Sequence, residues 1–199
     1  KIGMELCMSQ DFFPLLAWLR DQGKKVFVDL KFFDIPETVG RAVRALSERG
    51  AQFCTVHGNQ AIMEAAARSK SNGLKVLAVT ALTSLDRGDL DDLGFQCDVE
   101  ALVLSRARRA LAAGCDGVVS SGLEVARLRA EAPRELIVVT PGIRPVDNRV
   151  DGDQKRVMTP ARALQSGADY LVVGRPIRDA ADPRAAAQAI QAEIAAALA

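Results

Sequence analysis

The segment Val26-Phe27-Val28-Asp29-Leu30-Lys31-Phe32-Phe33-Asp34 is the most informative part of the sequence. Its first three residues are apolar and predict a buried β-strand, in which side chains two residues apart point to the same face. Asp29 and Lys31 are therefore expected to lie on one face at the end of this strand. A purely structural ion pair is the alternative, but desolvation offsets much of the attraction between buried charges, so stability alone is a weak reason to keep them. We interpret the charged cluster as a candidate functional site, because ionisable groups with shifted pKa values gather at such sites.

Strand and helix patterns alternate along the rest of the chain. Apolar runs rich in β-branched residues predict seven strands, at 26–30 and at Ile2–Leu6, Gln52–Val56, Lys75–Thr80, Asp116–Ser120, Leu136–Thr140 and Tyr170–Val173. The segments between them predict helices, at Asp11–Gln22, Glu37–Arg49, Ala61–Ser69, Val99–Ala113, Glu124–Glu131, Pro160–Ser166 and Pro183–Leu198. Several helical runs are followed by glycine, the residue preferred just after a helix C-terminus. This alternation is typical of an α/β fold with a parallel sheet.

The positions of the polar residues distinguish two parallel architectures. A doubly wound open sheet would carry a Gly-rich nucleotide-binding loop after its first strand, and no early strand–helix junction has one. A closed (β/α)8 TIM barrel instead places functional residues at the C-terminal ends of many strands, as the polar residues here are placed. We therefore predict a single (β/α)8 TIM-barrel domain over residues 1–199. Because only seven strands are visible and the first begins at the chain start, we expect the first βα unit to be missing and the domain to be N-terminally incomplete.

Composition excludes several classes of partner. The chain has 199 residues, 49% hydrophobic and 26% charged, with a formal net charge of +1. This balance gives no general attraction to nucleic acid or to an anionic membrane. Neither a signal peptide nor an apolar run of about 20 residues is visible, so a cytoplasmic protein is expected. The four cysteines are widely spaced and only one histidine, His57, accompanies them, so we expect reduced thiols and no metal site.

Two glycine–arginine pairs follow the last two predicted strands. Pro141-Gly142-Ile143-Arg144 comes after one strand, and Gly174-Arg175 comes after the next. In (β/α)8 enzymes the corresponding loops frequently bind phosphate, because glycine lets backbone N–H groups approach and arginine offers a forked donor. We therefore expect a phosphate ester as substrate. The polar segment Pro145–Thr159 between them suits a closing lid, although its basic residues, like Arg144, could also be solvated loop charges.

The whole chain resembles the bacterial type of the orotidine 5′-phosphate decarboxylase family. The resemblance rests on motifs in the same order: Lys1-Ile2-Gly3-Met4-Glu5, Val28-Asp29-Leu30-Lys31-Phe32-Phe33-Asp34-Ile35-Pro36-Glu37-Thr38, Val79-Thr80-Ala81-Leu82-Thr83-Ser84, Thr140-Pro141-Gly142-Ile143-Arg144, Gly152-Asp153-Gln154 and Val173-Gly174-Arg175-Pro176. The Asp-x-Lys-x-x-Asp-Ile-Pro run is highly specific, whereas Gly-Arg-Pro alone is weak. The resemblance implies a homodimer of (β/α)8 barrels that converts orotidine 5′-monophosphate to uridine 5′-monophosphate and carbon dioxide, without metal or organic cofactor.

The resemblance also assigns roles to individual residues. It implies a catalytic network of Lys1, Asp29, Lys31 and Asp34, with Lys31 as the proton donor to C6 and Asp34 supplied to the partner's site. Thr38 would reach the partner's ribose and Thr83 the pyrimidine. The phosphate and lid positions match Pro141, Arg144, Gln154, Gly174 and Arg175. The family's first strand also supplies a ribose-binding aspartate, which this chain does not contain, so the activity of these residues alone is in question.

Two alternatives stay open at this stage. Magnesium-dependent sugar-acid-phosphate decarboxylases and hexulose-phosphate aldolases share the Asp-x-Lys-x-x-Asp pattern, although Ile35-Pro36 and the Thr140–Arg144 motif argue against them. An inactive nucleotide-binding relative is the non-enzymatic alternative. We expect His57 to be structural rather than a substrate contact, and Met4, Met8, Phe12, Phe13 and Trp18 to pack in the core or a dimer interface.

Overall fold

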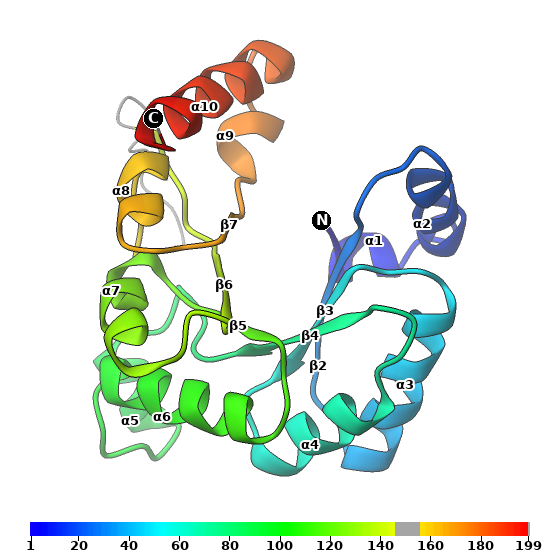
Figure 1. Ribbon diagram of the computed structural model, residues 1–199, viewed down its shortest axis with the longest axis vertical. Helices are drawn as coiled ribbons and strands as arrows, with labels where there is room; N and C mark the ends of the chain where they lie inside the picture. The colour runs from blue at the N-terminus through cyan, green and yellow to red at the C-terminus, as the bar shows by residue number, and fades with distance from the viewer. Residues whose placement is uncertain (146–155, 199) are drawn as a thin grey trace. The chain divides into compact units, whose positions relative to one another are not determined.

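The computed structural model describes residues 1–145 and 156–198. Within these residues there are seven strands, as expected: β1 (Ile2–Gly3), β2 (Phe27–Phe32), β3 (Phe53–His57), β4 (Lys75–Val79), β5 (Gly117–Val119), β6 (Ile137–Thr140) and β7 (Tyr170–Leu171). Each is hydrogen-bonded to the strand that follows it in the chain, so the sheet order runs from β1 to β7 (Figure 1). The pairs β1–β2, β2–β3, β3–β4 and β6–β7 are parallel. This confirms the parallel α/β prediction.

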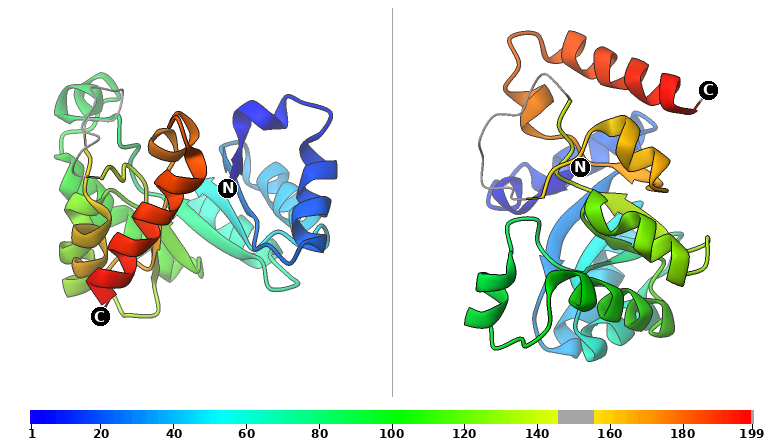
Figure 2. Two further views of the ribbon diagram at one scale, coloured as in Figure 1. Left: turned by 90° about the horizontal axis from the view of Figure 1, so that it is seen from above. Right: turned by 90° about the vertical axis from the view of Figure 1, so that its left-hand side faces the viewer.

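Helices connect these strands. They are α1 (Met4–Cys7), α2 (Phe12–Asp21), α3 (Pro36–Glu48), α4 (Gln60–Ser69), α5 (Arg87–Asp92), α6 (Val99–Ala112), α7 (Gly122–Glu131), α8 (Pro160–Gln165), α9 (Arg175–Arg178) and α10 (Pro183–Leu198). The chain divides into two compact units, one of residues 1–80 with 106–118 and one of residues 81–105 with 119–199. Figure 2 shows α3 and α4 side by side in the first unit, and α8 beside α10 in the second.

Strands β3 and β4 of the first unit are buried along most of their length. Four successive residues of each are buried, which is typical of a parallel sheet covered on both faces. Helices α3 and α4 can approach closely because Gly40 has no side chain. A Cβ atom at Gly40 would lie 2.8 Å from Ser69 Oγ, so a larger residue would push the two helices apart. The β2–β3–β4 layer supports the charged residues Asp29 and Lys31, which lie in β2.

The same two hydrogen bonds, formed by an aspartate, lie at the start of two strand pairs. Asp116 donates from its backbone N to Val76 O at 2.9 Å, and its carboxylate accepts from Val76 N at 2.8 Å. Asp169 repeats this pattern on Val138, with the same two distances of 2.9 and 2.8 Å. A basic side chain pairs with each carboxylate. The aspartate thus extends the ladder by one bond and helps to fix the register.

The first strand is shorter than the sequence indicated. A strand was expected over Ile2–Leu6, but β1 ends at Gly3 and α1 begins at Met4. The segment Met4-Glu5-Leu6-Cys7 has no β-branched residue and contains good helix formers, which favours a helical turn once pairing with β2 ends. Within the described part of the chain, no helix is both long and apolar enough to cross a membrane.

Candidate active site

Three charged side chains form an ion network at β1 and β2. Lys1 Nζ lies 2.8 Å from Asp29 Oδ2, and Lys31 Nζ lies 2.9 Å from Asp29 Oδ1. The Asp29 side chain is only 11% exposed, whereas those of Lys1 and Lys31 are 34% and 37% exposed. The carboxylate is therefore held inside, and the two ammonium groups remain accessible to a ligand. The structure brings together three of the four residues expected to form the catalytic network.

The network keeps Asp29 ionised. Burial by itself raises the pKa of the Asp29 carboxyl, but the hydrogen bonds and positive charges of Lys1 and Lys31 outweigh burial and leave this pKa below its ordinary value. A negative charge is consequently fixed at a nearly buried position between two cations. An anionic ligand group placed beside Asp29 would be repelled by it and attracted by Lys31.

Thr55 on β3 links both residues of the Asp29–Lys31 pair. Its Oγ1 donates to Asp29 Oδ1 at 2.9 Å and accepts from the backbone N of Lys31, also at 2.9 Å. The Thr55 side chain is fully buried. Lys31 itself has a φ of 49°, a left-handed conformation that is rare for a residue with a side chain. The β2–β3 register shifts at the same place, since Val28 pairs with Cys54 while Phe32 pairs with Val56.

Asp34 and Thr38 lie beyond the strand, at the start of α3. Asp34 is exposed, and its Oδ1 accepts from the backbone N of Ile35 at 2.6 Å. Among the described residues, Asp34 forms no ion pair with Lys1 or Lys31. Thr38 is half-buried within α3. The structure of one chain therefore does not join Asp34 or Thr38 to the network formed by Lys1, Asp29 and Lys31.

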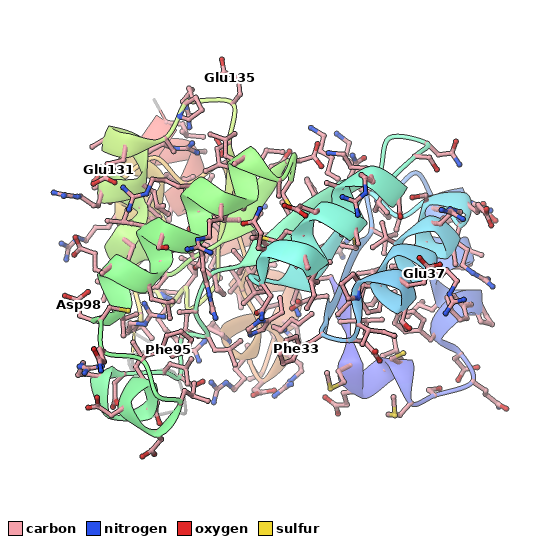
Figure 3. All side chains as sticks on the ribbon, turned by 90° about the horizontal axis from the view of Figure 1, so that it is seen from below. Phe33, Glu37, Phe95, Asp98, Glu131 and Glu135 are labelled. Atoms are coloured by element: carbon pink, nitrogen blue, oxygen red, sulfur yellow. The ribbon has the colours of Figure 1, made fainter. Side chains whose placement is uncertain are left out.

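An open groove of about 570 Å³ lies beside Asp34. It is lined by residues 33–36 and 59–62. Phe33 and Ile35 are both 65% exposed at its edge, and Figure 3 shows Phe33 beyond β2 and Glu37 on α3. The Phe33 ring lies against His57, with ring centroids 4.4 Å apart, and His57 Nδ1 is 2.8 Å from Asn59 Oδ1. His57 thus contacts Phe33 and Asn59, both of which line the groove.

In the second unit, the expected phosphate residues follow β6 and β7. Gly142 has a φ of 75°, and its carbonyl accepts from Met158 N at 3.1 Å. Arg144 N donates to Met158 O at 2.9 Å, which holds residues 142–144 against the segment before α8. Gly174 precedes α9, and a Cβ atom there would meet no atom within 4 Å. The backbone at Gly174 is thus open to a ligand, next to Arg175.

Thr83 lies on a loop that is fixed by a buried ion pair. Arg156 Nη1 lies 2.5 Å from Glu124 Oε1, and the two side chains are 10% and 7% exposed. Arg156 Nη2 also donates to Leu82 O at 2.9 Å, directly before the buried Thr83. Burial raises the pKa of Glu124 above its ordinary value, although the charge and hydrogen bond of Arg156 oppose this shift. Arg156 is therefore not a solvated loop charge, contrary to one of the alternatives considered for the basic residues of 145–159.

We expect Arg156→Met to destabilise the protein by about 3–5 kcal/mol, because it leaves the Glu124 carboxylate buried without its cation. Urea unfolding of the purified variant measures this loss. Arg127→Met is the matched control, since Arg127 is 60% exposed and pairs with Glu131 at the surface. Removing such a surface pair changes stability by at most about 1 kcal/mol. Equal losses in the two variants would contradict the importance of the buried pair.

Gln154 lies outside the described residues, as does most of the segment expected to form a lid. Thr55, Glu124 and the buried position of Arg156 were not predicted from the sequence. A polar residue inside the apolar strand Phe53–His57 was a usable signal for Thr55. Glu124 had no comparable signal, because it lies in an ordinary first helical turn.

Charged side chains at the C-terminal end of one parallel strand, with glycine–arginine loops after the last two, are characteristic of a (β/α)8-barrel enzyme. Comparison with known proteins gives the family. Residues 1–190 match the model of the orotidine 5′-phosphate decarboxylase / HUMPS family. The chain belongs to this family.

Individual relatives agree with this assignment. An orotidine 5′-phosphate decarboxylase of Methylococcus capsulatus is 72% identical over 194 residues, which cover 98% of this chain and 80% of the relative. One from Rhodopseudomonas palustris strain BisB5 is 53% identical, covering 98% of this chain and 83% of the relative. The crystal structure of orotidine 5′-phosphate decarboxylase from Lactobacillus acidophilus superimposes with a TM-score of 0.83 at 36% identity, covering 97% of this chain and 85% of the other.

Proposed function

We propose that this protein is a carboxy-lyase of pyrimidine biosynthesis that converts orotidine 5′-monophosphate to uridine 5′-monophosphate and carbon dioxide. The observation that carries the proposal is the Lys1–Asp29–Lys31 network, in which one nearly buried carboxylate holds two accessible ammonium groups. Membership of the family and the names of the relatives support the same reaction.

The reaction needs a cation at the carbon that loses its carboxylate. The bond between C6 and the carboxylate carbon breaks, carbon dioxide leaves, and the electron pair stays on C6, where no adjacent carbonyl can accept it. The Lys31 ammonium stabilises this charge and transfers a proton from Nζ to C6, which completes the uridine ring. The neutral amine then regains a proton from solvent. Asp29 lies near the leaving carboxylate, while Lys1 pairs with the other oxygen of Asp29.

Repulsion by Asp29 is too weak to account for such a reaction. Two like charges about 4 Å apart repel by roughly 4 kcal/mol at an effective dielectric constant of 20. Enzymes typically lower barriers by about 8–23 kcal/mol. Interactions made only in the transition state, including that of Lys31 with the developing charge, must therefore supply the larger part, and binding of the remote phosphate offsets the unfavourable placement of an anion beside Asp29.

The remaining site residues have binding roles in this proposal. Thr83 hydrogen-bonds the pyrimidine. The phosphate end is held by Pro141, Arg144, Gln154, Gly174 and Arg175. The protein acts as a cytoplasmic homodimer, in which Asp34 and Thr38 enter the partner's site. The exposed apolar side chains of Phe33 and Ile35 on either side of Asp34 support a partner surface there.

Loss of orotidine 5′-monophosphate, followed by ultraviolet absorbance with EDTA present, tests the proposed function. We expect the purified protein to form uridine 5′-monophosphate and carbon dioxide in equal amounts, at a rate that added Mg²⁺ does not change. Turnover that needs Mg²⁺ would instead support a metal-dependent sugar-phosphate enzyme of the same superfamily. Binding of uridine 5′-monophosphate without any turnover would support an inactive relative.

A further inference from the structure

We propose that Thr55 is a positioning residue for the reaction, whose hydroxyl sets the place of Lys31 relative to Asp29. This inference rests on the proposed function, because it assumes that Lys31 delivers the proton. Thr55 has no expected contact with the substrate and acts only through the two residues that it bonds.

The two hydrogen bonds of Thr55 account for the role. The hydroxyl has one hydrogen, which it donates to Asp29 Oδ1 at 2.9 Å, and its oxygen accepts the backbone N–H of Lys31 at 2.9 Å. The same Asp29 Oδ1 accepts from Lys31 Nζ at 2.9 Å. The hydroxyl therefore holds both ends of the lysine: the backbone directly, and the ammonium through a shared carboxylate oxygen.

The backbone of Lys31 explains why such a bond is needed. With a φ of 49°, Lys31 occupies a region that residues with side chains rarely adopt, and the parallel ladder between β2 and β3 shifts between Val28 and Phe32. The regular β2–β3 ladder thus does not fix this residue. The Thr55 hydroxyl takes the place of a ladder acceptor for the Lys31 N–H, and surrounding contacts of this kind are what maintain an unfavourable backbone conformation.

Threonine suits this position better than valine, serine or cysteine. A β-branched side chain has restricted rotamers in a strand, so the fully buried hydroxyl is held in one orientation by packing. Valine has the same shape but neither donates nor accepts. Serine keeps the hydroxyl and loses the restriction, whereas the cysteine thiol is a weak donor and a weak acceptor.

Steady-state kinetics on Thr55→Val, Thr55→Ser and Thr55→Cys test the inference, with orotidine 5′-monophosphate as substrate and uridine 5′-monophosphate as binding probe. We expect Thr55→Val to lower kcat by about 100-fold, the scale of an ångström-sized misplacement of a catalytic group. The affinity for uridine 5′-monophosphate should stay at the wild-type value, because binding does not need the proton of Lys31. Thr55→Ser should restore most of kcat, and Thr55→Cys should not.

A folded Thr55→Val variant with wild-type kcat would overturn the inference, whether or not its KM rises. If Thr55→Val does not fold, the comparison of Thr55→Ser with Thr55→Cys decides, and equal kcat values in these two would also refute the role. Failure of the proposed function is distinguishable, because the wild-type protein itself would then show no turnover.

Discussion

Lys31→Ala is expected to abolish turnover of orotidine 5′-monophosphate while leaving the binding of uridine 5′-monophosphate measurable. The variant loses the group proposed both to donate the proton and to stabilise charge at C6. General acid catalysis contributes about 10²–10⁴-fold, and a single electrostatic donor contributes about 10²–10³-fold. A loss in kcat of at least about 10⁴-fold is therefore expected, and the ultraviolet assay measures it.

Lys25→Ala is the matched control for this prediction. Lys25 is exposed, lies just before the same strand, and is replaced by the same substitution. It should retain wild-type kcat and KM. Substantial turnover by Lys31→Ala would contradict the assignment of the proton donor, and an equal loss in Lys25→Ala would show that the effect is not specific to the site.

The charged pair was predictable from the sequence because its partners are two residues apart. Strand parity placed Asp29 and Lys31 on one face, and their side chains do form an ion pair. The strand is nevertheless not regular at this point, because Lys31 has a positive φ and the β2–β3 register shifts beside it. The pairing was therefore correct, and the backbone geometry assumed for it was wrong.

Other parts of the site depend on residues that are distant in the chain. Thr55 meets Asp29 across 26 residues, and Arg156 meets Glu124 across 32. Such contacts are set by the packing of whole elements, which local patterns do not encode. Strands β3 to β6 were predictable because strands of a parallel sheet that are buried on both faces are almost continuously apolar. The extent of β1 was not predictable, because its end depends on where pairing with β2 stops.

Asp34→Ala is expected to lower kcat/KM by about 100-fold or more, because the proposed network loses a carboxylate from every site of the dimer. The location of Asp34 makes a sharper test possible. It is exposed, bonds only the adjacent backbone N of Ile35 in the described hydrogen bonds, and stands beside a groove edged by exposed apolar side chains. If it serves the partner's site, a defect in Asp34 and a defect in Lys31 on different subunits should complement each other.

Coexpression of Lys31→Ala and Asp34→Ala subunits with different tags allows the mixed dimer to be isolated. One of its two sites would then contain Lys31 from one subunit and Asp34 from the other, so about half of the wild-type activity is expected from a two-fold symmetric pair. The matched control is a mixed dimer of Lys31→Ala with Asp29→Ala. Asp29 and Lys31 form an ion pair within one chain and are proposed to act in their own subunit's site, so neither site of this dimer would be complete and no activity should return. A Lys31→Ala/Asp34→Ala dimer no more active than its parent homodimers would place Asp34 in its own subunit's site, because each of its two sites would then lack one of the two residues.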